Sequence, residues 1–298
     1  MAAKYGPLNW FATRGRSRAE RITARALAAS LGRYARAREA YERSRIYKSL
    51  SHEESRISEL IEHFGWDVAS RARACRRWFF GDDERLERFL SQLGISYEQY
   101  AVMHQCIAFH RLDPARPDLF WIYDEVLERL EALGGPDQLT ILDFGGGIGQ
   151  IAAAFAGEGY RTVLTDALPY NRDFARFTFD NRGLDVEIHA PRAPDDFFDT
   201  AADGRRFGLV IESSSLEHVP NTLGATRAMS GGLVPGGMLV STLLGEQPSA
   251  EKRAFFERDA GDEAIAAQLF DPALHAWVRE HYVIEARTRS DMHLLIKR

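Results

Sequence analysis

The residues best suited to binding chemistry are a run of glycines with an acid in front of it. Asp143-Phe144-Gly145-Gly146-Gly147-Ile148-Gly149 follows a short apolar segment and opens a helical one. Glycines permit positive φ angles and let a ligand approach the backbone closely. A helix N-terminus adds free N–H groups and a partial positive charge. The run therefore predicts a ligand-binding loop at the carboxyl end of a strand.

A second acid, Asp166, ends the next strand-like segment, 23 residues after Asp143. An acid in that place can accept hydrogen bonds from both hydroxyls of a ribose. The spacing D-x-G-x-G-x-G differs from the G-x-G-x-x-G of dinucleotide folds. Asp143 would repel a pyrophosphate but attract an ammonium or sulfonium group. The pattern thus favours a cationic nucleoside over NAD.

The elements that must position these acids are strands alternating with helices. Strands are expected at 139–144, 160–167, 184–190, 207–215, 238–244, 281–287 and 293–298. Such alternation predicts a doubly wound α/β fold, a Rossmann-like parallel sheet with helices on both faces. The last two strands are joined by a turn too short for a parallel crossover, so this pair should be antiparallel.

The first third of the chain carries almost no strand signal and is rich in helix-forming residues. We expect an all-α cap or lid over residues 1–134 and a Rossmann-like domain over 135–298. The first 48 residues hold 12 basic and 3 acidic side chains. The favoured interpretation of this arm is a helix whose arginine-rich face is exposed to solvent. A nucleic-acid-binding segment and a transit peptide are the less favoured alternatives.

Composition excludes several other classes of protein. Hydrophobic residues make up 45% and charged residues 27%, which is ordinary globular usage. Two cysteines cannot form a disulfide framework or a four-cysteine zinc site. No apolar run approaches the ~18 residues of a membrane span. We expect a cytoplasmic protein without a metal, and the composition leaves its oligomeric state open.

Residues 138–298 resemble the class I S-adenosylmethionine-dependent methyltransferases. ILDFGGGIG is similar to the first motif of that family, and VLTDA is similar to the second. FGLVIESSSLEHVPN resembles the fourth motif, and GGLVPGGMLVSTLL resembles the turn and fifth strand that follow it. The four segments occur in the family's order, which is far more specific than any one of them.

The resemblance implies S-adenosylmethionine as co-substrate and a role for each motif residue. Gly145 and Gly147 would pass along its methionyl part, Asp143 would hold its amino group, and Asp166 would bind the ribose. Where the family often has a Gly-Asp pair after the third strand, this chain has Pro191 and Arg192, and Asp196 beside Phe197 is the suggested substitute. The full predicted cofactor set is Asp143, Gly145, Gly146, Gly147, Gly149, Asp166, Ala167, Leu168, Asp196, Phe197, Glu212, Ser213 and Ser214.

Two residues are candidates for catalysis. His218, after the fourth predicted strand, has a pKa range suited to a general base, although a Glu-His-Val sequence is often structural in this family. Tyr123 could face the sulfonium through a cation–π contact, and core packing on its helix is the alternative.

The function most favoured is methyl transfer to a small-molecule acceptor enclosed by the helical lid, without membrane or nucleic-acid partners. A second enzyme class remains open, in which the aminocarboxypropyl group reacts, for example by cyclisation to azetidine-2-carboxylate with release of methylthioadenosine. An RNA methyltransferase or RNA-binding partner, and a non-catalytic member, are weaker alternatives. The acceptor itself is not indicated.

Overall fold

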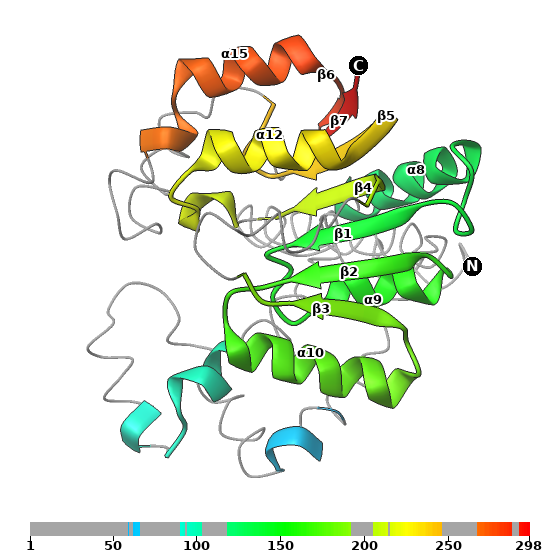
Figure 1. Ribbon diagram of the computed structural model, residues 1–298. Coiled ribbons are helices and arrows are strands. Elements are labelled where there is room, and N and C mark those ends of the chain that lie inside the picture. Colours follow the sequence, from blue (N-terminus) through cyan, green and yellow to red (C-terminus); the bar gives the residue numbers. More distant parts are fainter. Residues whose placement is uncertain are drawn as a thin grey trace, which may run out of the picture.

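A seven-stranded sheet organises the computed structural model of the protein. The structure describes residues 59, 62–65, 90–92, 94–102, 118–191, 205–213, 215–245, 267–287 and 292–298. Its strands lie in the order β3-β2-β1-β4-β5-β7-β6 (Figure 1). They are β1 (Thr140–Phe144), β2 (Arg161–Thr165), β3 (Val186–His189), β4 (Phe207–Glu212), β5 (Leu233–Ser241), β6 (Tyr282–Arg287) and β7 (His293–Lys297).

The strand directions confirm the predicted fold class. β3, β2, β1, β4 and β5 pair in parallel, whereas β7 pairs antiparallel with both β5 and β6. The central strands β1 and β4 are buried along their whole length, as expected for parallel strands covered on both faces. The carboxyl ends of the parallel strands therefore meet at one edge of the sheet, where the predicted acids lie.

Helices cover the two faces of the sheet in separate groups. α8 (Asp118–Ala132) and α9 (Gln150–Gly157) pack together on one face, and α10 (Pro169–Arg182) packs beside α9. α12 (Thr222–Gly232) and α15 (Pro272–His281) cover the other face, and a short 3-10 helix, η2 (Leu216–His218), follows β4. This arrangement places the glycine loop between β1 and α9.

Most predicted elements match the observed ones, and β5 differs most. The sequence suggested a turn before a strand at 238–244, but β5 already begins at Leu233 and continues through Gly236 and Gly237. Leu233 pairs with Phe207, and the register shifts before Leu209 meets Met238. An irregular strand carrying a proline and two glycines looks like a turn in sequence, and only pairing with β4 shows that it is a strand.

α8 belongs to the core of the sheet domain, although it precedes β1. Ile122, Val126, Leu127 and Leu130 are almost completely buried in one cluster with β1, β4, β5 and β7. Leu130 packs against Gly208, where an added Cβ would come within 3.0 Å of its Cδ2. The linker from α8 to β1 is short, and it leaves this helix packed on the sheet.

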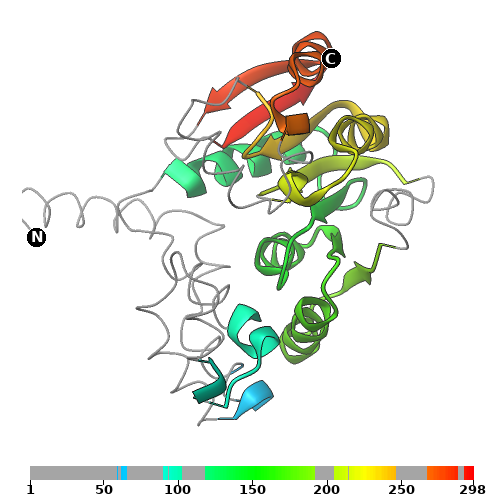
Figure 2. The ribbon, with the colours of Figure 1, turned by 90° about the vertical axis from the view of Figure 1, so that its left-hand side faces the viewer.

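The part of the N-terminal third described at Glu59 and residues 62–65 contacts α10, beside which it lies in Figures 1 and 2. The Arg182 guanidinium donates to both carboxylate oxygens of Glu59 at 2.7 Å. The ring of Phe64 stacks on Phe174 with ring centroids 6.0 Å apart, and His63 meets the same ring edge-on. These contacts join residues 59–65 to the sheet domain, while the basic arm lies outside the described residues.

The part of the chain that the structure describes includes no helix that is both long enough and apolar enough to span a bilayer.

Candidate cofactor site

The loop between β1 and α9 is shaped by its glycines. Gly145, Gly147 and Gly149 have φ angles of 63°, 58° and 72°. These are left-handed values that residues with a side chain adopt only at a cost. Gly146 instead serves close packing, because a Cβ on it would lie 2.3 Å from Cγ of Asp143. The loop thus folds tightly over the Asp143 carboxyl.

Asp143 is buried beneath that loop. Its Oδ2 accepts a hydrogen bond of 3.0 Å from the backbone N–H of Ala152 in α9. Burial raises the pKa of Asp143 to about 7, and the nearby charge of Asp166 adds to the rise. A carboxyl that ionises near neutrality and has one oxygen free of this bond is suited to receive a cation.

We expect the stability of the ligand-free protein to fall as pH rises through about 7, because ionised Asp143 is poorly solvated. The folded-state pKa of Asp143 lies above its unfolded value. The stabilisation that this group contributes is therefore fully present below about pH 4 and lost above about pH 7. Asp143→Asn should weaken this pH dependence and raise the melting temperature at pH 8. Thermal unfolding at pH 5 and pH 8 measures the effect.

Asp137→Asn, at an exposed position, is the matched control. A stability profile of Asp143→Asn identical to that of the wild type would contradict the assignment of the raised pKa to Asp143.

Asp166 joins the end of β2 to the glycine loop and to α10. Its Oδ2 accepts from Gly147 N–H at 2.9 Å, and its Oδ1 accepts from Leu168 N–H at 2.8 Å and Asn171 Nδ2 at 3.1 Å. Burial raises the pKa of this carboxyl, while these hydrogen bonds oppose the rise. The supporting amide, Asn171, was not identified from the sequence. Its position two residues into α10, after Pro169, was the available signal.

Glu212 ends β4 and is fully buried. Its Oε1 accepts from the backbone N–H groups of Ser215 and Leu216 at 3.0 and 3.2 Å, and its Oε2 accepts from Ser241 Oγ at 2.5 Å. Ser215 Oγ donates to the Phe144 carbonyl at 3.1 Å. Glu212 therefore ties the ends of β1, β4 and β5 together. Its predicted place in the pocket lining stays a prediction, because the structure shows its oxygens engaged by protein groups.

The loop after β4 packs directly on the glycine loop. A Cβ on Gly145 would lie 2.4 Å from Cβ of Ser215, so only glycine fits beside this serine. The network of Glu212 thus fixes Ser215, and Ser215 in turn limits where the glycine loop can lie. Sequence reasoning did not identify Ser215 or Ser241 as supports, because their role depends on contacts between separate strands.

The two predicted catalytic residues lie in different environments. His218, in η2, has an exposed side chain, whereas its neighbour Glu217 is fully buried. Tyr123 is buried in the cluster around α8, and its ring meets Phe155 edge-on at 6.2 Å. Burial raises the pKa of its hydroxyl, and the charges of Asp143 and Glu212 add to this. A role for either residue in catalysis remains a prediction.

The other predicted cofactor residues are only partly described. Ala167 is exposed, Ser213 is half-buried, and Leu168 is 42% exposed, which leaves an apolar side chain open beside Asp166. Ser214, Asp196 and Phe197 lie outside the described residues. Among the residues that are described, no group of three or more His, Cys, Asp or Glu side chains could hold a metal ion.

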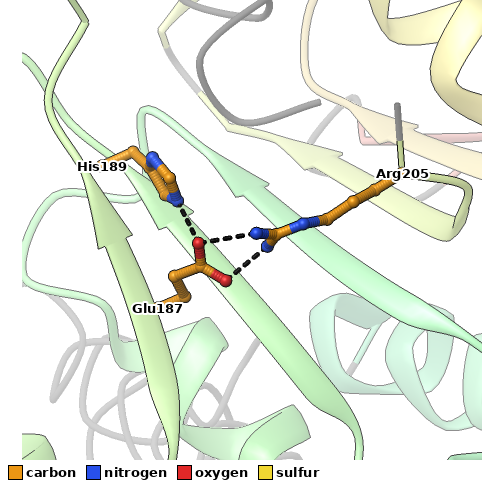
Figure 3. A network of polar contacts seen from close by, with 3 residues as sticks. All are labelled: Glu187, His189 and Arg205. Carbon is orange, nitrogen blue, oxygen red and sulfur yellow. Dashed lines mark hydrogen bonds and ion pairs between the residues drawn. The ribbon is translucent and has the colours of Figure 1, made fainter. Parts of the chain in front are cut away.

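A polar network at the edge strand β3 was not predicted from the sequence (Figure 3). Glu187 accepts both from His189 Nε2, at 2.6 Å, and from the guanidinium of Arg205, just before β4. The Arg205 and His189 contacts lower the pKa of Glu187 to about 2. The backbone carbonyl of His189 accepts from Asp166 N–H at 3.3 Å, so the network is adjacent to the predicted ribose end.

The set of acids at three neighbouring strand ends fits one kind of ligand. β1 lies between β2 and β4, and the register aligns Phe144 with both Thr165 and Glu212. Asp143 lies beneath the glycine loop at Gly146, and Asp166 accepts from the N–H of Gly147 in the same loop. Carboxylates in this arrangement suit a ribonucleoside that carries a positive charge and oppose a pyrophosphate. The residues present thus fit S-adenosylmethionine.

Comparisons of this chain with known proteins all identify methyltransferases. A family model described as a methyltransferase domain matches residues 118–282, which is more than half of the chain. A ubiquinone biosynthesis O-methyltransferase of Cereibacter sphaeroides (strain ATCC 17025 / ATH 2.4.3) is 30% identical over 145 residues, covering 47% of this chain and 56% of that protein. The protein of the same name from Ruegeria sp. (strain TM1040) is 27% identical over 173 residues, covering 56% and 65%.

The chain thus matches about half to two thirds of the length of these curated relatives. The solved structure of an O-methyltransferase family protein from Burkholderia thailandensis aligns with 81% of this chain and 71% of its own, with 18% identity and a TM-score of 0.44. The family match begins at the first residue of α8, includes the glycine loop, both acids and the strands β1 to β5, and ends at the first residue of β6. The chain belongs to the class I S-adenosylmethionine-dependent methyltransferase family.

Proposed function

We propose that this protein transfers the methyl group of S-adenosylmethionine to a hydroxyl of a small-molecule acceptor. The observation that carries the proposal is that Asp143 and Asp166 both pack against the glycine loop, Asp143 at Gly146 and Asp166 at Gly147. The relatives named as O-methyltransferases support oxygen as the acceptor atom. Methyl transfer is a direct displacement, so the main task of the protein is to align donor and acceptor and exclude water.

Each site residue has a role in this proposal. Asp143 binds the ammonium of the methionyl end, and Asp166 binds the ribose hydroxyls. Exposed Leu168 covers one face of the adenine. Glu212 acts indirectly by holding Ser215 against the glycine loop. His218, in η2 three residues after Ser215, is the candidate base for the acceptor hydroxyl.

The N-terminal third is proposed to cover the site. Support comes from Tyr97 and Glu98, which act on the end of α10 next to Asp166, whereas the Glu59–Arg182 ion pair lies at the opposite end of this helix. The charges of Tyr97 and Glu98 add to the burial that raises the pKa of Tyr170 at the start of α10. Asp166 affects Tyr170 in the same way. These interactions favour a lid that lies over the adenosine end of the site. In this proposal α8 belongs with the sheet, and the cap lies before it.

Calorimetry and product analysis test the proposed activity. We expect the full chain to bind S-adenosylhomocysteine and to bind NAD poorly. We also expect turnover to produce S-adenosylhomocysteine. Accumulation of methylthioadenosine without an added acceptor would instead show aminocarboxypropyl chemistry, and tighter binding of NAD would overturn the cofactor assignment.

We expect Asp166→Ala to weaken S-adenosylhomocysteine binding by about 1.5–3 kcal/mol, the scale of hydrogen bonds to a charged group. Titration calorimetry measures the change, and a far-UV spectrum like wild type must accompany it. Asp180→Ala, on the exposed side of α10, is the matched control. Unchanged affinity in Asp166→Ala would remove the carboxylate from the ribose site.

A further inference from the structure

His275 is a fully buried histidine that the proposed methyl transfer does not use. It lies near the start of α15, and its ring contacts the corner that leads into this helix, residues 267–271. Nε2 of the ring lies 2.8 Å from the backbone carbonyl oxygen of Leu269. Because a carbonyl oxygen can only accept, Nε2 carries the proton and donates this bond. The corner is therefore joined to α15 by a type of side chain whose ordinary pKa lies near neutrality.

The other ring nitrogen of His275 has no comparable contact. In the part of the chain that the structure describes, Nδ1 lacks a hydrogen-bond partner and is closed to solvent. A neutral ring has no proton on this atom. Protonation would add an N–H donor and a positive charge there, and burying both without compensation is costly. The closed corner therefore favours the neutral form of the ring.

The charged groups around the ring do not compensate such a proton. Burial lowers the pKa of His275, and the charge of Arg279 adds to this, whereas the hydrogen bond to the corner and the charge of Asp271 oppose it. Asp271 is already engaged as the N-cap of α15. On α12, which covers the same face of the sheet (Figure 1), the guanidinium of Arg227 lies over the ring of Trp277 instead.

The corner also supports the loop after β4. Oε1 of Gln268 accepts from the backbone N–H of Thr222 at 3.2 Å, and Thr222 is the fully buried first residue of α12. The loop that ends there includes η2 with the candidate base His218. Leu269 is buried in the apolar cluster that contains Val219 of the same loop. Opening the corner would therefore remove two supports of the loop after β4.

We propose that His275 is a pH-sensitive switch, which keeps the corner closed while its ring is neutral and opens it when the ring takes up a proton from water. The protonated ring carries a charge that its surroundings do not compensate, so it moves toward solvent and its bond to Leu269 breaks. Gln268 then no longer fixes Thr222, and the order of the loop after β4 depends on pH. This inference does not rest on the proposed function, since no co-substrate or acceptor takes part.

Unfolding at two pH values tests the switch. The unfolded chain takes up this proton at about pH 6.5, and the folded chain does so only at lower pH. The stabilisation from neutral His275 is therefore fully present above about pH 6.5 and is lost as pH falls. Over each pH unit below 6.5, we expect the unfolding equilibrium constant of the wild type to rise by up to about tenfold relative to His275→Gln, whose amide can donate to Leu269 but takes up no proton. Denaturant unfolding of the full chain at pH 7.5 and 5.5 measures this, and the contribution of Asp143 is common to both chains.

Amide exchange distinguishes a local opening from a uniform loss of stability. At pH 5.5, after correction for the intrinsic pH dependence of exchange, the N–H of Thr222 should lose protection in the wild type but not in His275→Gln. The N–H of Val210, in the centre of β4, should stay protected in both. His281→Gln, at a half-buried position at the end of the same helix, is the matched control and should behave like the wild type.

Equal acid sensitivity of the wild type and His275→Gln would overturn the switch. If His275→Gln does not fold, nuclear magnetic resonance titration of the wild-type imidazole gives the answer. We expect protonation of the His275 ring to coincide with the loss of protection at Thr222. A ring that takes up its proton while Thr222 stays protected would overturn the proposal, and either result leaves the proposed function standing.

Discussion

A chain that starts at Leu139 should not fold, although it contains all four segments that resemble motifs of the methyltransferase family. Removing α8 exposes the sheet surface on which Ile122, Val126, Leu127 and Leu130 are buried. Each of these side chains contributes about 1.5–3 kcal/mol, so together they contribute about 6–12 kcal/mol. That approaches the whole stability of a typical domain, which is about 5–15 kcal/mol.

Circular dichroism and thermal unfolding of the truncated chain test this expectation, with a chain that starts at Asp118 as the control that keeps α8. A matched pair of point variants gives the same information without truncation. Leu130→Ala should lower the free energy of unfolding by about 2–5 kcal/mol. Leu133→Ala, just after α8 and 37% exposed, should have a far smaller effect. A chain from Leu139 that melts cooperatively near the wild-type temperature would contradict this account.

Replacing Gly146 with alanine should abolish co-substrate binding. The new Cβ would lie 2.3 Å from Cγ of Asp143 and within 2.6 Å of both of its carboxylate oxygens. Asp143 has little room to move, because it is buried and bonded to Ala152 in α9. Either the loop or the carboxylate must therefore shift, and each shift separates the acid from the ammonium it is proposed to hold. We expect S-adenosylhomocysteine affinity to fall by about two orders of magnitude and stability by about 1–3 kcal/mol.

Calorimetry together with thermal unfolding separates the two effects of this substitution. Gly231→Ala is a matched control, since Gly231 lies inside α12 with nothing within 4 Å of an added Cβ. That variant should gain about 0.5–1 kcal/mol, because alanine favours helices more than glycine does. Wild-type affinity in Gly146→Ala would show that the tight contact with Asp143 has no role in binding.

The tertiary structure also changes the meaning of several residues that the motifs identify. Glu212 has the position of a pocket residue in sequence, but Ser215, Leu216 and Ser241 occupy its carboxylate. Tyr123 is likewise an aromatic residue ahead of the first strand, yet its ring packs in the α8 core. Glu212 therefore acts on the site indirectly, through the position of Ser215 against Gly145.

The amino-acid sequence by itself determined the order of strands and helices, the reversed final strand and the positions of Asp143, Asp166 and the glycine loop. These features depend on local patterns, namely runs of apolar residues, turn-forming glycines and the spacing between successive motifs. Only the tertiary structure decided that α8 belongs to the sheet core, that burial raises the pKa of Asp143 to about 7 and that Glu212 holds Ser215 beside the glycine loop. Burial, pKa and hydrogen bonding depend on residues far apart in the chain, and no local pattern encodes which of them will meet.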